Sequence, residues 1–355
     1  MSQSLPKVFI TPNVTEQAAD PATEAGVDYK ATDWRQIVKQ YTRPNRAKAI
    51  GQLCNTFIPY IGLWVVMFFT MSISWPLTIA LAMFAALFLA RIFIIFHDCG
   101  HGSFFASKKA NDVLGFITGL CTFTPYRHWR WQHAVHHGCS GNLDERGIGD
   151  VWTMTVKEYL AAPWYIRLQY RFMRHPLVLF GLIPLGLFWV YQRFTYAEAN
   201  KADKRSVYKM NAAIAIYVMV LSLIFGFWNF FWIQLAVSVT CGTVGVWLFY
   251  VQHQFEDTYW SEGGEWDYTL SAMQGSSFYK LPAVLNWFSG NIGYHHIHHL
   301  SSRIANYNLK ACHESETYFQ QVPELTLRAS LKSLNLRLWD EENRKLIRFC
   351  ELKGR

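Results

Sequence analysis

Residues 75–101 read WPLTIALAMFAALFLARIFIIFHDCGH, an apolar run that ends directly on two histidines, His97 and His101. The run belongs to a longer tract, because no charged residue occurs from Gly51 to Ala90. Roughly forty residues of helix would measure about 60 Å, twice the hydrocarbon thickness of a bilayer. The tract therefore predicts two membrane crossings joined by a turn.

A second uncharged tract, Met210 to Phe255, is again long enough for two crossings, and it contains His253 close to its end. The turn of the first pair is expected at residues 72–76, so that the second crossing runs from Trp75 to Phe96. The turn of the second pair is expected near residues 226–229. Each pair of predicted crossings therefore ends beside a histidine, His97 or His253.

The composition agrees with a membrane protein. Of the 355 residues 51% are hydrophobic and only 16% are charged, which is too apolar for an ordinary soluble chain of this length. The net charge of +8 does not indicate nucleic acid, because no compact patch interleaves basic and aromatic residues. Attraction of basic loops to anionic lipid headgroups explains it. The seven cysteines form no CxxC pair and are typical of reduced packing residues.

Charge also predicts orientation. Nearly all basic residues fall in 30–48, 104–209 and 301–355, whereas the two short turns have none. By the positive-inside rule both termini and the long middle segment are expected in the cytoplasm. Pro176 to Gln192 is uncharged but only about 25 Å long as a helix. We expect it to be a re-entrant or interfacial segment broken at Pro184.

The two ends of the chain are expected to lie outside the membrane domain. Residues 1–28 have the composition of a mobile tail. For residues 29–50 we expect an amphipathic helix capped by Thr32, either lying on the membrane surface or packed on the protein. Residues 316–355 are expected to form a cytoplasmic helical segment after a membrane domain that covers 51–315.

Three short stretches, HDCGH (97–101), HAVHH (133–137) and HHIHH (295–299), share one pattern. On a helix, positions i and i+4 lie on one face and i+3 beside them. The histidines expected to face a common site are His97, His101, His133, His136, His137, His253, His295, His298 and His299. Charge places all four segments on one membrane side. His296 lies at the edge of its group.

Nine imidazoles are too many for one ion, and a tetrahedral zinc site takes at most four. Two octahedral-type transition ions would use the whole set and leave positions open for oxygen or water. Fe, Co, Ni, Cu and Zn all accept imidazole, and iron is the one that performs oxygen chemistry at open sites. Metal-bound imidazoles usually donate their second N–H to a carboxylate or carbonyl. Candidates for supporting the ligands are Asp98, Asn142, Asp144, Glu145, Asp150, Glu256, Asp257 and His296. The alternative is a solvated loop charge for the carboxylates and a turn residue for Asn142.

The three boxes, divided by two hydrophobic hairpins, resemble those of the membrane-bound fatty acid desaturases. WLFYVQHQFED, GNLDERGIGDVW, GSSFYKLP and GNIGYHHIHHLSSRIANYNL are similar to stretches of bacterial acyl-lipid desaturases. The Δ5 type of bacilli is the nearest match, with the Δ12/ω-6 desaturases of cyanobacteria and chloroplasts as relatives. The likeness covers roughly residues 50–315.

The resemblance implies an all-α integral membrane protein with about four transmembrane helices and a cytoplasmic helical cap, in a bacterial inner membrane. It implies that the nine histidines above hold two irons, which use O2 to remove two hydrogens from an acyl chain. His296 is expected to tolerate change best. Phe93, Phe96, Gly245 and Trp247 are candidates for the wall of an acyl slot, with ordinary packing as the alternative.

Two electrons are needed in each turnover, and the chain has no Gly-rich nucleotide loop, no CxxC pair and no fused haem module. A separate ferredoxin-like or flavodoxin-like donor is therefore implied. Such donors are acidic, and the basic residues Lys108, Lys109, Arg127 and Arg130 are candidates for receiving one. Contact with lipid headgroups explains these charges equally well.

Two other functions remain open. A hydroxylase, ketolase or alkane monooxygenase of the same superfamily would use the same metals to place oxygen on carbon, although GSSFYKLP and SSRIANYNL favour a desaturase. A metal-binding transporter would need polar groups lining the crossings. Here the histidines end the crossings instead, which argues against transport.

Overall fold

Four long apolar helices form the frame of the chain in the computed structural model, which describes residues 33–196 and 199–352. They pair as two hairpins, α2 (Arg46–Thr70) with α3 (Trp75–His101) and α9 (Lys201–Phe225) with α10 (Phe227–His253). Each is long and apolar enough to cross a membrane. The predicted architecture of two hairpins is confirmed, and α3 continues through the first histidine box.

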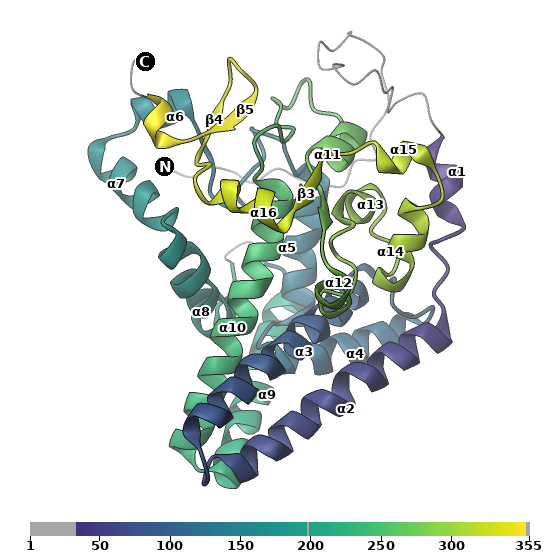
Figure 1. Cartoon of the computed structure of the whole chain (residues 1–355), viewed down its shortest axis with the longest axis vertical. Coiled ribbons are helices and arrows are strands. Elements are labelled where there is room, and N and C mark those ends of the chain that lie inside the picture. Colours follow the sequence, from purple (N-terminus) through teal and green to yellow (C-terminus); the bar gives the residue numbers. More distant parts are fainter. Residues whose placement is uncertain (1–32, 197–198, 353–355) are drawn as a thin grey trace.

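The two turns lie where the sequence predicted them. Ser74 caps α3 by accepting a hydrogen bond from the backbone N–H of Leu77. Gly226 joins α9 to α10 at a φ of +79°, a left-handed conformation that favours glycine. The ring of Phe225, at the end of α9, lies 5.5 Å from that of Trp64 in α2, so the two hairpins pack together near their turns. In Figure 1 both turns lie at the lower end of the molecule.

The helices differ in how they are covered. α3 packs against both α2 and α10, and its side chains are mostly buried. Helices α2 and α9 instead leave large apolar side chains exposed, among them Ile61, Phe69, Ile216 and Leu223. Exposed apolar faces on long helices fit contact with lipid acyl chains. α3 is therefore the central helix, and it carries the first two histidines to its far end.

The other described elements are short, and most lie at the end of the molecule opposite the turns (Figure 1). We call this end the cap. Its helices include α5 (Tyr126–Cys139), α6 (Val156–Ala161), α11 (Tyr268–Gln274), α12 (Ala283–Phe288), α13 (His295–Leu300), α14 (Asn306–His313), α15 (Thr317–Gln320) and α16 (Leu327–Ser330). Two further helices, α4 (Lys108–Cys121) and α7 (Trp164–Met173), flank the spans.

The C-terminal segment differs from the helical one predicted for residues 316–355. It contains β3 (Glu324–Thr326), β4 (Leu338–Asp340) and β5 (Lys345–Ile347) beside short helical turns. β4 pairs in parallel with β1 (Met154–Thr155) and antiparallel with β5, and β3 pairs in parallel with β2 (Phe278–Lys280). Strands β1 and β4 are far apart in the sequence, so no local pattern reveals their pairing. These strands fasten the C-terminal segment to the cap.

The N-terminal prediction also needs correction. Residues 29–50 do not form one helix: α1 covers Trp34–Lys39, and α2 begins at Arg46. Trp34 and Val38 are buried, and the Trp34 ring stacks on Tyr268 at 6.5 Å. The apolar face of α1 therefore packs on the protein, which is the second of the two placements predicted for this helix. The tail of residues 1–28 and the cap Thr32 lie outside the described residues.

Residues 178–193 form a helical segment of changing pitch, with π-helical turns at Val178–Leu182 and Gly186–Val190 around a short α-helix, α8 (Ile183–Leu185). Pro184 does not break it, contrary to the prediction. The bend, of 62°, lies instead between α7 and Val178. At one end Arg174 binds Gln254, and at the other Gln192 binds Gln132 of α5. Contacts to the cap at both ends favour a re-entrant segment over a full crossing.

Two residues of α10 explain why Pro184 is tolerated. Proline has no N–H, so residue 184 cannot make an α-helical hydrogen bond to the carbonyl of Phe180, four residues earlier. The hydroxyl of Thr243 donates to that carbonyl at 2.6 Å. Beside it, a Cβ on Gly242 would lie 2.7 Å from the Cβ of Pro184, so only glycine fits there without movement. A polar group freed inside a membrane protein is thus satisfied by a neighbouring helix.

We expect Thr243→Val to lower the free energy of unfolding by about 1–2 kcal/mol, because it leaves a buried carbonyl without a donor. Thr243→Ser keeps the hydroxyl and is the matched control. Denaturant unfolding of the purified variants in detergent measures the difference. Equal stability of the valine and serine variants would contradict this role of Thr243.

Candidate metal centre

The nine predicted histidines come together where the two central spans end. His97 and His101 occupy the last turn of α3, and His253 is the last residue of α10. The remaining six lie on two cap helices that cross these ends, His133, His136 and His137 on α5 and His295, His298 and His299 on α13. Histidines more than 150 positions apart in the sequence thereby become neighbours, as the His298 ring of α13 lies 4.4 Å from the His97 ring of α3.

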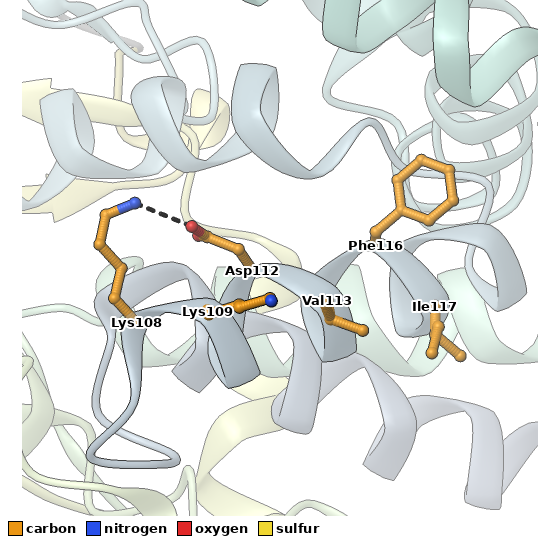
Figure 2. A pocket seen from close by; sticks show the side chains of 6 residues that line it. All are labelled: Lys108, Lys109, Asp112, Val113, Phe116 and Ile117. Carbon is orange, nitrogen blue, oxygen red and sulfur yellow. Dashed lines mark hydrogen bonds and ion pairs between the residues drawn. The ribbon is translucent and has the colours of Figure 1, made fainter.

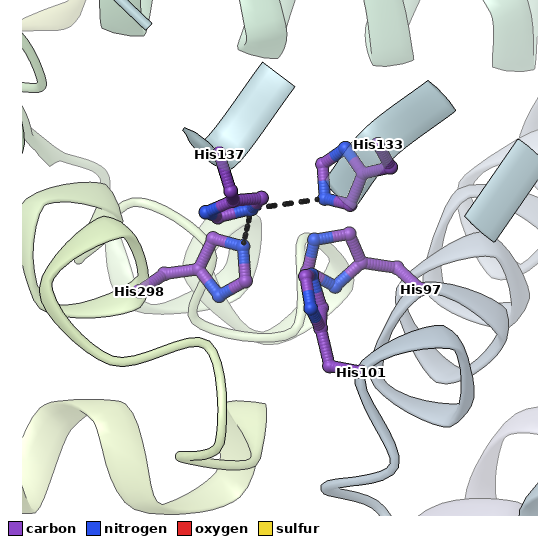
Figure 3. A group of neighbouring side chains, drawn as sticks. All are labelled: His97, His101, His133, His137 and His298. Carbon is purple, nitrogen blue, oxygen red and sulfur yellow. Dashed lines mark hydrogen bonds between the residues drawn. The ribbon is translucent and has the colours of Figure 1, made fainter. Parts of the chain in front are cut away.

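The rings divide into two groups. The first consists of His97, His101, His133, His137 and His298, which each offer a ring nitrogen within 4.8 Å of all the others. Figure 3 shows these rings pointing toward one another from three elements. The second group consists of His136, His253 and His299. His295 joins it, because its Nε2 lies 2.9 Å from the Nε2 of His253.

The distances within the groups fit metal ligands. The Nε2 atoms of His137 and His133 are 3.1 Å apart, and those of His298 and His137 are 2.9 Å apart. Imidazole binds transition ions at about 2.0–2.1 Å, so two ligands at right angles are about 3 Å apart. Several buried ring nitrogens also lack any hydrogen-bond partner, among them Nε2 of His101, His136 and His299. An orphaned buried nitrogen is costly, and an ion would satisfy it.

The protonation state also suits metal binding. Burial lowers the pKa of His133, His137, His295, His298 and His299 well below the usual imidazole value, and the neighbouring rings lower it further. A low pKa keeps these rings neutral at physiological pH. A neutral imidazole has the free lone pair that a metal needs.

Two of the predicted carboxylates support ligand rings. Asp98 is buried, and its Oδ1 lies 3.1 Å from Nδ1 of His97. Its Oδ2 accepts two hydrogen bonds from Asn306, from the backbone at 2.6 Å and the side chain at 2.8 Å. Asp150 Oδ1 lies 2.6 Å from Nδ1 of His136. Such contacts fix the ring so that Nε2 faces the ion.

A backbone carbonyl plays the same part for a third ligand. Nδ1 of His253 lies 3.2 Å from the carbonyl oxygen of Gly275, which ends α11. Neither Gly275 nor Asn306 was singled out in the sequence. A supporting backbone carbonyl cannot be recognised from the residue type. Asn306 lies in the stretch GNIGYHHIHHLSSRIANYNL, which was interpreted only through its resemblance to desaturases.

The other predicted supports lie elsewhere. Asn142 accepts a hydrogen bond from the backbone of Asp144, and Asp144 accepts one from Gly263. Both stabilise the loop after α5. Asp257 is exposed, as are Glu145 and Glu256. The alternative reading of these positions as loop residues fits the contacts.

His296 is buried and pairs with His313 instead, at 3.1 Å between Nε2 and Nδ1. It therefore faces away from both histidine groups, although it lies between two ligands in the sequence. His313 is buried as well, so the contact packs His296 inside the cap.

These observations define an integral membrane protein of helical hairpins with an all-imidazole site for two metal ions at one end of its spans. The sequence profile described as fatty acid desaturase matches residues 73–327, and the chain belongs to the fatty acid desaturase family. It is thus an oxidoreductase.

Three relatives show the breadth of the family around this chain. A fatty acid desaturase of Bacillus subtilis is 44% identical over 93% of this chain and 94% of its own length. The sn-1 oleoyl-lipid 12-desaturase of Synechocystis is 26% identical over 86% of each chain. The sn-1 acyl-lipid omega-3 desaturase (ferredoxin) of the same organism is 27% identical over 63% of each.

We expect Asp150→Ala to weaken metal binding about 10–100-fold, because the His136 ring loses the partner that orients it. Asp144→Ala removes a nearby carboxylate that contacts no histidine, and it should bind metal as the wild type does. Metal content after dialysis against graded chelator concentrations measures both. Equal retention by the two variants would contradict the assignment of Asp150.

Proposed function

We propose that the chain is a di-iron, O2-dependent acyl-lipid desaturase of the bacterial plasma membrane, with its metal centre and both termini in the cytoplasm. The convergence of nine imidazoles into two adjoining groups is the observation that carries this proposal. Two groups match two ions, and iron is the imidazole-binding metal that reacts with O2. The named activities of the relatives supply the substrate class, an acyl chain carried on a membrane lipid.

The iron pair, when bound, supplies the oxidising power that removes two hydrogens from neighbouring methylenes, with electrons from a ferredoxin-like or flavodoxin-like carrier. The chain's own residues hold the ligands and keep water out. Asp98 and Asp150 orient His97 and His136, as described above. Apolar residues near α10 then have to guide an acyl chain to the ligands.

The face of α10 that carries His253 offers such a guide. Gly245 and Phe249 lie two turns and one turn before His253 on the same face. The Phe249 ring lies 5.1 Å from that of His136 and 5.2 Å from that of His253. A Cβ added at Gly245 meets nothing within 4 Å, so there is open space beside this glycine. We infer that the acyl chain lies along this face.

The other residues proposed for the slot wall have packing roles. Phe96 is fully buried, and its ring contacts those of Trp129, at 4.8 Å, and Tyr126. The Trp247 indole donates to the hydroxyl of Tyr279 at 3.2 Å and packs on Phe180. Phe93 contacts Phe188 of the re-entrant segment at 6.0 Å. Of the four, Gly245 is the one with space beside it.

Expression in a host that lacks polyunsaturated lipid, together with ferredoxin and its reductase, tests the activity. We expect mass spectrometry to show a new double bond in membrane acyl chains, with about two irons bound in each chain. His136→Ala removes a ligand of the smaller histidine group and should abolish the product. An unchanged lipid profile, a hydroxylated product or about one zinc per chain would refute the proposal.

The acyl path has its own test. Gly245→Leu should lower product formation on the order of tenfold, because the added side chain fills the space that the acyl chain needs. Gly62→Leu is the matched control, since Gly62 lies in span α2 and also meets nothing within 4 Å. Both variants should bind metal normally. Equal activity of the two would place the acyl chain elsewhere.

A further inference from the structure

The two histidine groups differ in their access to water. His136, His253, His295 and His299 are all buried. In the five-histidine group, His101, His133 and His137 are only partly buried. Two of these three project from α5. The side of the centre that α5 covers is therefore the side that lies nearest to solvent.

The outer face of α5 carries exposed basic and small residues around Trp131, which is partly exposed. Arg127, Arg130, Ala134 and Gly138 are exposed and follow one another at intervals of three or four, as positions on one helix face do. His133 and His137 lie at the border of this stripe. Because Ala134 and Gly138 have little or no side chain, a partner can approach these ligands closely.

Several exposed cations lie around the Arg127 end of the stripe, whereas Asp144 and Glu145 are exposed in the loop beyond Gly138. Arg127 lies beside the first turns of α9, where it binds Asp203 at 2.7 Å, and Lys201, Arg205 and Lys209 of that helix are exposed. Arg130 is exposed at 46% of its side chain, and its nearest acidic contact, with Asp112, is long at 3.8 Å. A pair of that length and exposure neutralises little of the charge.

The neighbouring helix α4 has a different surface. Lys108 and Lys109 there stand beside exposed Val113, Phe116 and Ile117, around an open depression of about 570 Å³ (Figure 2). Lysines beside apolar side chains suit the boundary between lipid headgroups and acyl chains. The α5 stripe has no exposed large apolar residue. It therefore suits water and a soluble partner, and the α4 surface suits lipid.

We propose that the stripe Arg127–Arg130–Ala134–Gly138 is the docking surface for an acidic one-electron carrier, and that electrons enter the centre at the five-histidine group. This inference rests on the proposed function. Each reduced carrier gives up one electron and becomes oxidised, and that electron reduces one ferric ion to the ferrous state. Two carriers docking in turn supply the pair of electrons, and the 4.3 Å stacking of His137 on His299 joins the two groups.

Charge reversal on the stripe tests the surface. In neutral-lipid nanodiscs at low salt, the double variant Arg130→Glu with Ala134→Glu should bind oxidised [2Fe–2S] ferredoxin at least about tenfold more weakly than the wild type, and the difference should shrink at high salt. The rate of reduction by reduced ferredoxin should fall equally. Reduction by dithionite, which needs no docking, should be unchanged and shows that the centre is intact. Lys332→Glu, at an exposed lysine of the C-terminal segment, is the control and should bind as the wild type does.

Three outcomes would overturn the inference. These are an unchanged ferredoxin affinity in the double variant, an equal loss in Lys332→Glu, and an effect confined to binding of anionic vesicles, which would make the stripe a headgroup contact. The binding measurement is independent of catalysis. A wild-type chain that binds ferredoxin through this stripe but forms no double bond would refute the proposed function and not the docking surface.

Discussion

The convergence of nine imidazole rings in a buried site is the constraint on which the rest of this structure depends. Without a metal, several buried ring nitrogens have no partner, and a proton on one ring would repel its neighbours. Both costs disappear when the rings share ions. Metal binding and folding are therefore coupled: ions held at the site stabilise the fold that gathers these rings.

Gathering the rings requires rigid supports from both membrane and cap. The packing of α3 on α10 fixes the ends of the two spans, and with them His101 and His253. Asp98 joins α3 to α14 through Asn306, so one carboxylate both orients His97 and fastens the cap. The parallel pairs β1–β4 and β2–β3 tie the C-terminal segment to the same cap. Each connection limits how far α5 and α13 can move from the spans.

The sequence predicted the spans and the gathering of the histidines because each leaves a local signal. Uncharged tracts of a given length indicate crossings, and histidines at i, i+3 and i+4 share a face. Supports were harder to predict: Asp98 and Asp150 reach histidines, whereas Asp144 and Asp257 do not. A loop carboxylate has no periodicity that shows where it points.

Long-range contacts account for the remaining differences. Proline usually breaks a helix, but Thr243 on another helix satisfies the carbonyl that Pro184 frees. The strands of the C-terminal segment pair with strands far away in the sequence, and a local sequence pattern cannot predict such pairing. His296 lies in the middle of a ligand box, but its helix turns it toward His313.

The unequal burial of the two histidine groups suggests how one centre serves two partners of opposite polarity. An acyl chain has to come from the lipid side and be shielded from water, which fits the fully buried group beside Phe249 and Gly245. A soluble carrier has to come from the aqueous side, which fits the partly exposed group beneath α5. Because rings from the two groups stack directly, ions held there would be linked without a passage that also admits water to the acyl chain. The same nine histidines would thus separate the approach of the acyl chain from the approach of the carrier.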